Sequence, residues 1–219
     1  VTCAKNKKVT EAAKYTVKFI GNYKGVKAVS GTYKITQADF SDAKAYAPDM
    51  IFKKKGKYNP APYVVIDGVL LPKNNYTVKY FDGTTEITGL SSFDLGSADQ
   101  KKIRLEITGK NSYESDVITA YCYVRRPGTI DMTKAKIVDK DTEKPIGGMF
   151  FTGAAVVPEN IAVYAGNNRI SPDRYDVEVV NNVQKGKATI IVTGKVGTAA
   201  AGTRTAGFNI NAKKMSSFD

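Results

Sequence analysis

The strongest constraint on the fold is a hairpin pattern that occurs three times along the chain. In each copy an alternating apolar and polar segment leads into a glycine-centred turn, and a second alternating segment follows. The copies are 14–35, 102–124 and 187–210, with turn glycines Gly21, Gly109 and Gly194. Self-similarity of this kind indicates small modules repeated along the chain rather than one large domain.

A second match lies ahead of the last two hairpins. Segments 64–80 and 161–179 each contain a strand, a Gly turn, a short strand, a Pro-initiated turn and a Tyr-x-Val strand. Asp39–Ala45 and Asp131–Ile137 match at the opening of each unit. These matches predict two complete units preceded by the C-terminal half of another. The expected domains are the half unit 1–36, the complete units 37–124 and 125–212, and a tail at 213–219.

The half unit at 1–36 is a poor folding solution by itself. It would leave open strand edges and half of a core. We therefore expect the natural protein to continue upstream with strands that complete this unit.

Period-2 alternation identifies the repeated segments as β-strands. Tyr15, Val17 and Phe19 alternate with lysine and threonine, and segment 102–107 has the same pattern. Successive side chains of a strand face opposite sides, so one face is apolar and the other wet. No stretch keeps the apolar spacing of a helix for long. About seven short strands per unit predict an all-β chain of tandem immunoglobulin-like β-sandwiches.

The joints between units are short. Only Thr36, Gln37 and Ala38 separate the half unit from the next, and residues 125–128, which include Pro127, separate the two complete units. Flexible linkers are longer and richer in Gly and Ser, and proline stiffens the chain. We therefore expect an extended rod with restricted hinges.

The composition argues against an enzyme. The chain has no histidine, so neither a Ser-His-Asp nor a Cys-His arrangement can form, and the commonest zinc ligand is missing. Carboxylate pairs and lysine chemistry remain open. We expect no catalytic residues, no metal site and no cofactor.

The two cysteines are expected to be structural. In the matched register Cys122 falls where Tyr33 and Phe208 lie, an inward position of the last strand, and Cys3 also falls at an inward position. Both are then small buried hydrophobes, whose burial makes them unreactive. Because they lie in different units, we expect no disulfide between them.

The net charge of +12 is unevenly spread. Residues 1–35 carry eight lysines and one glutamate (+7), residues 36–124 carry eleven basic and eleven acidic residues (0), and residues 125–219 carry fourteen and nine (+5). A basic surface favours anionic partners, although a solvated lysine surface is the simpler explanation. No nucleic-acid motif accompanies the charge. Apolar stretches such as 62–71 are too short to insert into a membrane.

One long loop departs from the repeat. The second unit uses 23 residues from Tyr80 to Ile103 (103 − 80), where the third uses 9 from Val179 to Ala188 (188 − 179). Long loops on a sandwich are often functional. The loop, residues 81–101, holds two aromatic residues and four carboxylates whose spacing matches no EF-hand. They are Phe81, Phe93, Asp82, Glu86, Asp94 and Asp99. A hairpin without a ligand is the alternative.

A second candidate is the outward face of the last strand of the same unit. Tyr121 and Tyr123 lie there, near outward Arg104 if the strands pair as a hairpin. Exposed tyrosines beside a guanidinium can stack on a sugar ring or on a neighbouring module. Cross-strand packing alone also accounts for them.

The pattern Gly-x-x-Leu-x-x-x-x-Tyr-x-Val-x-Tyr, followed by Gly-Lys-x-x-Tyr, resembles tandem bacterial immunoglobulin-like repeats. The residues that carry it are Gly68, Leu71, Tyr76, Val78, Tyr80, Gly109, Lys110 and Tyr113. The third unit keeps Gly166, Ile170, Tyr175, Val177, Gly194 and Lys195 but lacks the last aromatic residue. Such repeats occur in secreted or wall-attached surface proteins of Gram-positive bacteria. The resemblance implies fold more specifically than function.

Two functions follow from this resemblance. The first is a non-enzymatic, extracellular spacer of a bacterial cell-surface protein. The second is an adhesin module that binds carbohydrate or a host protein, through either the 81–101 loop or the Tyr121/Tyr123 face. The expected partners are a cell-wall polymer, a glycan or a host surface protein, with no nucleic acid and no membrane insertion. The candidate binding residues are Tyr121, Tyr123, Arg104, Phe81 and Phe93.

Overall fold

A computed structural model describes the chain except for residues 5–7, 54–60, 88–93, 129 and 213–219. Its regular elements are β-strands linked by turns and short 3₁₀ turns, which confirms the all-β prediction. Among the described residues, no helix has the length and apolar character needed to cross a membrane. The chain packs as two compact units. The first contains Val1–Asp42, Pro72–Thr77 and Thr108–Val117, and the second contains Ala43–Leu71, Val78–Ile107 and Ile118–Asp219.

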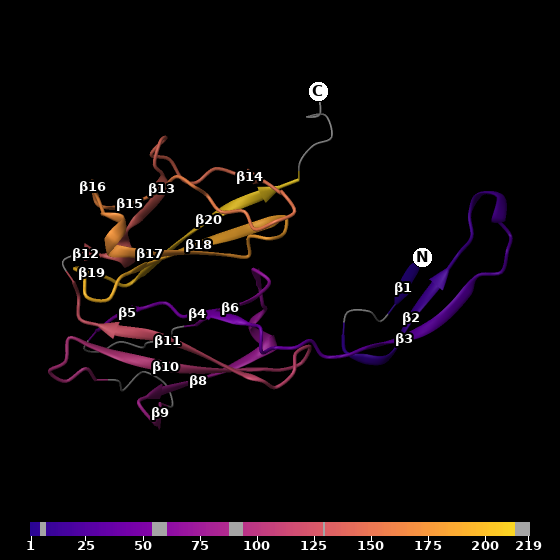
Figure 1. Cartoon of the computed structure of the whole chain (residues 1–219), viewed down its shortest axis with the longest axis horizontal. Coiled ribbons are helices and arrows are strands. Elements are labelled where there is room, and N and C mark those ends of the chain that lie inside the picture. Colours follow the sequence, from indigo (N-terminus) through magenta and orange to yellow (C-terminus); the bar gives the residue numbers. More distant parts are fainter. Residues whose placement is uncertain (5–7, 54–60, 88–93, 129, 213–219) are drawn as a thin grey trace. The chain divides into compact units, whose positions relative to one another are not determined.

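The amino-terminal sheet belongs to the first unit. Its strands, in order across the sheet, are β1 (Thr2–Ala4), β2 (Thr10–Val17) and β3 (Val29–Ile35) (Figure 1). All neighbours are antiparallel. A 3₁₀ turn, η1 (Gly21–Tyr23), lies between β2 and β3 and begins at the expected glycine, whose φ is +64°. The first hairpin therefore forms as its alternation predicts, except that β2 ends at Val17 and leaves Phe19 outside the strand.

The strands of residues 37–124 form two sheets, which we call the central sandwich. One sheet has the order β5-β11-β10-β8-β9 and the other β4-β6-β7. The strands are β4 (Lys44–Tyr46), β5 (Met50–Ile51), β6 (Tyr63–Ile66), β7 (Val69–Leu70), β8 (Tyr76–Asp82), β9 (Thr85–Glu86), β10 (Gln100–Gly109) and β11 (Val117–Arg125).

The strands of residues 125–212, the C-terminal sandwich, repeat this order as β14-β20-β18-β17 and β13-β15-β16. A small pair, β12 with β19, is additional. In both sandwiches a two-residue edge strand runs parallel to the last long strand, β5 beside β11 and β14 beside β20. The strands are β12 (Ile130–Asp131), β13 (Lys136–Asp139), β14 (Met149–Phe150), β15 (Ile161–Ala165), β16 (Asn168–Arg169), β17 (Tyr175–Val180), β18 (Gly186–Gly194), β19 (Ala200–Ala201) and β20 (Thr203–Asn211).

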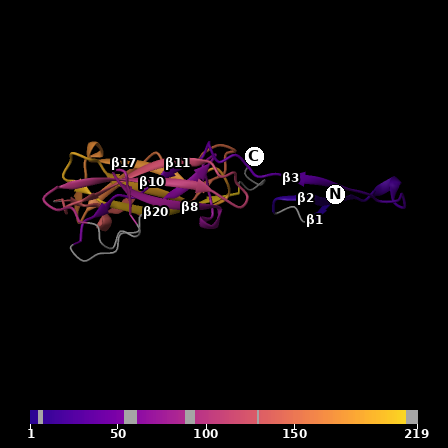
Figure 2. The same cartoon turned by 90° about the horizontal axis from the view of Figure 1, so that it is seen from below.

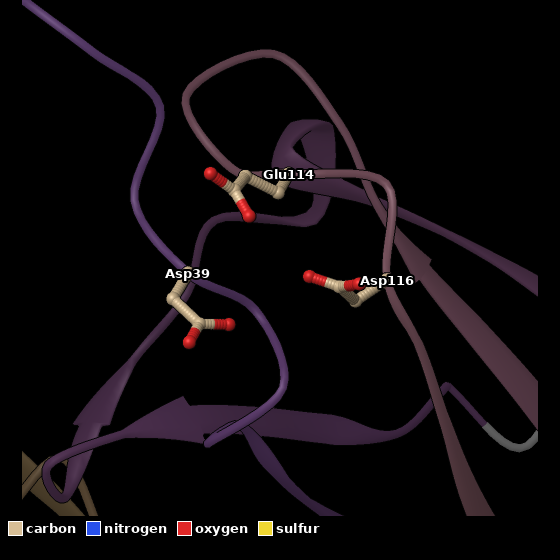
Figure 3. A group of neighbouring side chains, drawn as sticks. All are labelled: Asp39, Glu114 and Asp116. Carbon is tan, nitrogen blue, oxygen red and sulfur yellow. The ribbon is translucent and has the colours of Figure 1, made fainter.

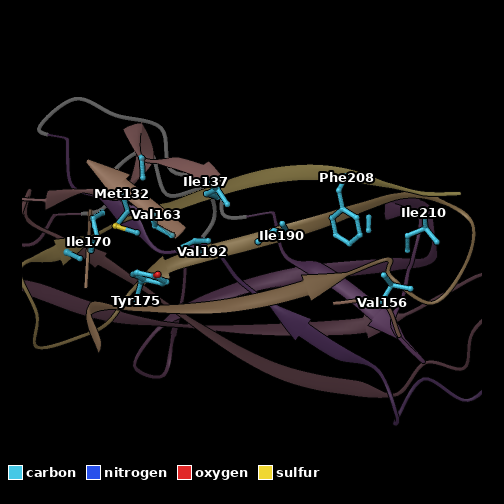
Figure 4. Packing of buried hydrophobic residues seen from close by; sticks show 13 residues of the cluster. Met132, Ile137, Val156, Val163, Ile170, Tyr175, Ile190, Val192, Phe208 and Ile210 are labelled. Carbon is cyan, nitrogen blue, oxygen red and sulfur yellow. The ribbon is translucent and has the colours of Figure 1, made fainter. Parts of the chain in front are cut away.

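The core of the C-terminal sandwich lies between its two sheets (Figure 4). Ala188, Ile190 and Val192, alternate residues of β18, have no exposed surface. They belong to one buried cluster with Phe208 of β20 and Val163 of β15. Burying an aliphatic side chain of this size stabilises a fold by about 1.5–3 kcal/mol. A one-residue slip of β18 would turn Ala188, Ile190 and Val192 to the other face, so the cluster fixes the register of this strand.

The repeat glycines Gly109 and Gly194 end the equivalent strands β10 and β18. A Cβ atom at Gly109 would overlap the carbonyl oxygen of Glu114. A Cβ atom at Gly194 would lie 2.6 Å from the carbonyl oxygen of Ala200. At both sites the chain folds back too closely for any side chain, which accounts for the glycines.

Within the second unit the two sandwiches pack against each other, so the expected extended rod is wrong for this pair. Val65 of β6 forms one buried cluster with Val180 of β17 and Ile191 of β18. These residues sit at strand positions that alternation would leave facing water. Instead, they join the β4-β6-β7 sheet to the outer face of the β17-β18 sheet. In Figure 2 the long strands of both sandwiches run along similar directions, as in aligned sheet packing.

Arg125, expected in a linker, is the last residue of β11 and is buried. Its guanidinium donates hydrogen bonds to four backbone carbonyl oxygens in the turn between β18 and β19 and in the strand residues that flank it. The acceptors are Gly194 (3.2 Å), Lys195 (3.4 Å), Thr198 (3.3 Å) and Ala200 (2.8 Å). The central sandwich thus caps a turn of the C-terminal sandwich with a charged group.

Asp49, just before β5, is buried close to this joint. Its carboxylate accepts a hydrogen bond from the Tyr123 amide (2.8 Å), and its own amide donates to Thr203 Oγ1 of β20 (2.9 Å). Burial raises the pKa of Asp49 to about 6, although the Tyr123 amide and the Arg125 charge act in the opposite direction. The Asp49 charge in turn adds to the burial that raises the pKa of Cys122 to about 12.

The two cysteines differ from each other. Cys122 is fully buried, as expected, whereas Cys3 is exposed, so the inward and buried prediction for Cys3 is wrong. Cys3 lies on the edge strand β1, where it is opposite Tyr15 of β2 in the strand register. No second sheet buries that side chain in the part of the chain that the structure describes.

We expect Arg125→Met to lower the free energy of unfolding by about 2–4 kcal/mol, because the substitution keeps the aliphatic stem but leaves buried carbonyl groups without a donor. Urea unfolding followed by circular dichroism measures this change. Arg204→Met is the matched control, since Arg204 is exposed and its guanidinium donates a hydrogen bond to the Thr133 carbonyl oxygen at 3.3 Å. Equal stability of the two variants would contradict the role of Arg125.

We expect Asp49→Asn to remove part of the pH dependence of the free energy of unfolding. Because the folded-state pKa of Asp49 lies above its ordinary value of 3.8, its contribution to stability decreases as pH rises from about 4 through 6. Relative to the Asp49→Asn variant, the wild type should lose up to roughly 3 kcal/mol of its free energy of unfolding between about pH 4 and about pH 6. Urea unfolding at several pH values compares the two. The burial that raises the pKa of Glu178 is common to both proteins, so it cancels in the difference. Parallel pH profiles would refute the prediction.

A thiol reagent such as Ellman's should modify one cysteine per native chain and two after unfolding. Cys3 is exposed, whereas Cys122 is buried with a raised pKa, and thiolates are the reactive form. The variant Cys3→Ser should therefore show almost no reaction when native, and Cys122→Ser should react as the wild type does. Two fast thiols in the native chain would contradict the burial of Cys122.

Candidate functional site

The predicted residues Phe81, Arg104, Tyr121 and Tyr123 belong to strands β8, β10 and β11, which are neighbours in one sheet. Their orientation follows from alternation. On β10 and β11 the residues that alternate with Arg104, Tyr121 and Tyr123 have no exposed surface, so these three lie on the opposite, outer face. Phe81 of β8 lies on the same face, because its ring contacts the Arg104 guanidinium. The buried residues are Ile103, Leu105, Cys122 and Val124.

Cations lie over aromatic rings on this outer face. The Arg104 guanidinium carbon is 4.2 Å from the Phe81 ring centroid, so the structure brings these two predicted residues together. Arg104 also forms an ion pair with Glu106, two residues along β10. Tyr121 is 49% exposed, and the Lys102 ammonium lies 3.9 Å from its ring centroid. Sequence analysis missed Lys102, although its position two residues before Arg104 on the same strand face was a usable signal.

We call Phe81, Lys102, Arg104, Tyr121 and Tyr123 the aromatic face. It offers flat apolar rings and, at Lys102 and Arg104, donors for an anionic or hydroxyl-rich group. Tyr123 is half-buried, and its backbone amide is already bonded to Asp49. Tyr121 and Lys102 are therefore the members most accessible to a ligand.

The 81–101 loop does not gather its carboxylates within the described residues. Asp82 pairs with Lys101 (2.9 Å), Glu86 with Lys79 (3.2 Å), and Asp99 lies 4.0 Å from Arg126. The Asp94 carboxylate accepts a hydrogen bond from the Gly96 amide at 3.0 Å. Each of these four carboxylates has a different partner, and they form no shared cation site among the residues that the structure describes. Phe93, a candidate binding residue, lies outside the described residues.

Three other carboxylates do converge, in the first unit. Asp39 precedes β4, and Glu114 and Asp116 lie in the β10–β11 turn (Figure 3). One oxygen from each lies within 4.8 Å of the others, and all three residues are exposed. Backbone bonds hold the two segments together, since the Ala38 amide donates to Ser112 (2.8 Å) and the Glu114 amide donates back to Ala38 (2.9 Å).

This acidic trio was not predicted, because its segments are brought together only by the tertiary fold. Hydrogen bonds from the hydroxyl and the amide of Ser41 hold the pKa of Asp39 below its ordinary value. One oxygen from each carboxylate would give three ligands, whereas Ca²⁺ takes six to eight. Exposed acidic groups are common without an ion. We therefore assign no metal to the trio.

The described surface has cavities, and the linings of two of them bear on catalysis. The first, about 290 Å³, is lined in the second unit by Lys136, Val138, Glu143, Tyr164, Gly166 and Asn167. The second, about 570 Å³, is lined in the first unit by Lys8, Val9, Pro72, Asn74, Asn75, Asn111 and Ser112. Glu143 accepts a hydrogen bond from the Tyr164 hydroxyl at 3.3 Å. These lining residues include one carboxylate in the first cavity and none in the second, so neither set supplies a glycosidase-type acid pair.

Comparison with known proteins adds little. No protein-family model matches the sequence, and no curated protein sequence matches it. Among solved structures, the chain is similar to the cadherin-like domains 1 to 4 of zebrafish RET, with a TM-score of 0.20 and 12% identity. The match covers 64% of this chain and 41% of that chain. A likeness this low carries no argument about function.

Proposed function

We propose that the chain is a non-enzymatic structural module of a bacterial cell-surface protein, built from tandem immunoglobulin-like repeats. The observation that carries the proposal is the capped joint, in which buried Arg125 of one sandwich bonds four carbonyl groups of the next. A module that fixes the separation of flanking segments needs such a joint. The spacer is then a stiff block of paired sandwiches instead of the rod first expected.

The charge and the repeat motif support an extracellular place for this module. The net charge of +12 favours contact with anionic wall polymers. The Gly, Tyr-x-Val and Gly-Lys pattern resembles repeats of wall-attached proteins, and its glycines and tyrosines serve packing. Tyr76 and Tyr175, the first tyrosines of the motif, are each only 6% exposed.

Antibodies raised against the folded chain should bind intact cells of the organism that carries its gene, without permeabilisation. Shaving the cells with a protease should remove the signal, while a cytoplasmic marker survives. Labelling that requires lysis would contradict the surface assignment.

A second candidate function is glycan or host-protein binding through the aromatic face. The observation in its favour is the stacked arrangement of Lys102 on exposed Tyr121 beside Arg104 on Phe81. Protein–sugar contacts commonly use such flat rings with adjacent donors. The simpler explanation remains that these pairs stabilise the sheet across its strands.

A glycan array that includes anionic wall polymers decides between the two functions. If the aromatic face binds a glycan, Tyr121→Ala should lower the affinity for that glycan at least tenfold, because the ring and its contact with Lys102 are lost. Tyr23→Ala is the matched control, because Tyr23 is 69% exposed and lies in the first unit. Silence across the array, or equal binding by both variants, would favour the spacer role.

A further inference from the structure

The amino-terminal sheet exposes a face that is buried in both sandwiches. Five aligned positions on the inward face of the hairpin have counterparts in the later repeats. The positions are Tyr15, Val17, Phe19, Tyr33 and Ile35, and their counterparts are Ile103, Leu105, Ile107, Cys122 and Val124, then Ala188, Ile190, Val192, Phe208 and Ile210. Every counterpart is at most 3% exposed. In the first hairpin Tyr33 of β3 and Phe19, two residues beyond the end of β2, are each 37% exposed, and the other three are half-buried.

Among the described residues, the β3 edge of this sheet is open, whereas the equivalent edge of each sandwich is covered by a short strand. β3 is the last strand of the order β1-β2-β3. Its counterparts β11 and β20 each carry a two-residue strand, β5 or β14, in parallel along that edge. The strands equivalent to β3 therefore pair with a neighbour on each side. Within the described structure β3 pairs with β2 on one side and leaves its other edge open.

The sister sandwiches indicate what would cover this face. In the C-terminal sandwich the cover is the sheet β13-β15-β16, whose Ile137 and Val163 contact the equivalent core. In both sandwiches the covering sheet and the parallel edge strand come directly ahead of the last three long strands in the chain.

We infer that the β1-β2-β3 sheet is a docking surface for the other half of a third sandwich. The occupant is a three-stranded sheet with an apolar face, together with a short strand that pairs in parallel with β3. By the precedent of both sister sandwiches, it is supplied by polypeptide joined directly ahead of Val1. A second copy of the chain fits the face poorly, since residues 1–35 carry eight lysines and one glutamate and two such sheets would repel.

Cys3 reports on the occupancy of this face. It lies opposite Tyr15 in the β1–β2 register, on the side that the occupant would cover, and it is exposed. The test compares the 219-residue chain with the same chain extended by the gene-encoded residues that precede Val1. A matched control carries a Gly/Ser extension of equal length. Both are made with Cys122→Ser, so that Cys3 is the thiol that reacts.

The native extension should slow the reaction of Cys3 with Ellman's reagent at least 100-fold and should protect β3 backbone amides from hydrogen exchange. The Gly/Ser extension should change neither. Unchanged Cys3 reactivity and unprotected β3 amides in the natively extended chain would overturn the inference. Protection that appears in the 219-residue chain as concentration and molar mass rise would overturn it as well, in favour of a second copy.

Discussion

The second compact unit depends on the burial of one charged group. A guanidinium removed from water must find acceptors for its N–H groups, and Arg125 finds four carbonyl oxygens in and beside the turn that follows β18. These acceptors belong to a different sandwich from Arg125 itself. The hydrogen bonds therefore hold two cores together, alongside the apolar contact of Val65 with Val180 and Ile191 and the Asp49–Thr203 hydrogen bond.

An apolar contact between the two sandwiches accompanies the Arg125 hydrogen bonds and explains why the sandwiches stack. Val65, Val180 and Ile191 are buried on strand faces that lie outside either sandwich core. Asp49 adds a directional tie, since it bonds the Tyr123 amide of β11 and the Thr203 hydroxyl of β20. A hydrophobic contact gives affinity without direction, whereas these polar bonds fix one arrangement. Stacking of this kind restricts the motion of one sandwich relative to the other, as the proposed spacer role requires.

Much of each sandwich could be predicted from the sequence because its signals are local. The alternation around Ile190 marks a strand with a core face, and Gly109 and Gly194 mark bends too tight for a Cβ atom. The side-by-side packing also left a signal. Ile190, Ile191 and Val192 are apolar in succession, which is typical of a strand covered on both faces.

Other features could not be predicted. The acceptors of Arg125 exist only once the turn after β18 has folded, and the acidic trio requires the segment of Asp39 to lie against that of Glu114. Cys3 was expected to be buried because the alignment assumed a complete unit around it. Its exposure follows from the absence of a covering sheet over β1, β2 and β3 among the described residues.

The most direct test of the stacked arrangement is a spin-label distance between β4 and β17, with labels at Lys44 and Asp176 in a Cys3→Ser background. Both residues are exposed, and each contributes to the electrostatic environment of Glu178 on β17. Stacked sheets lie about 10 Å apart, so the account predicts one short, narrow distance. A long or broad distribution, as two sandwiches joined end to end would give, would contradict it.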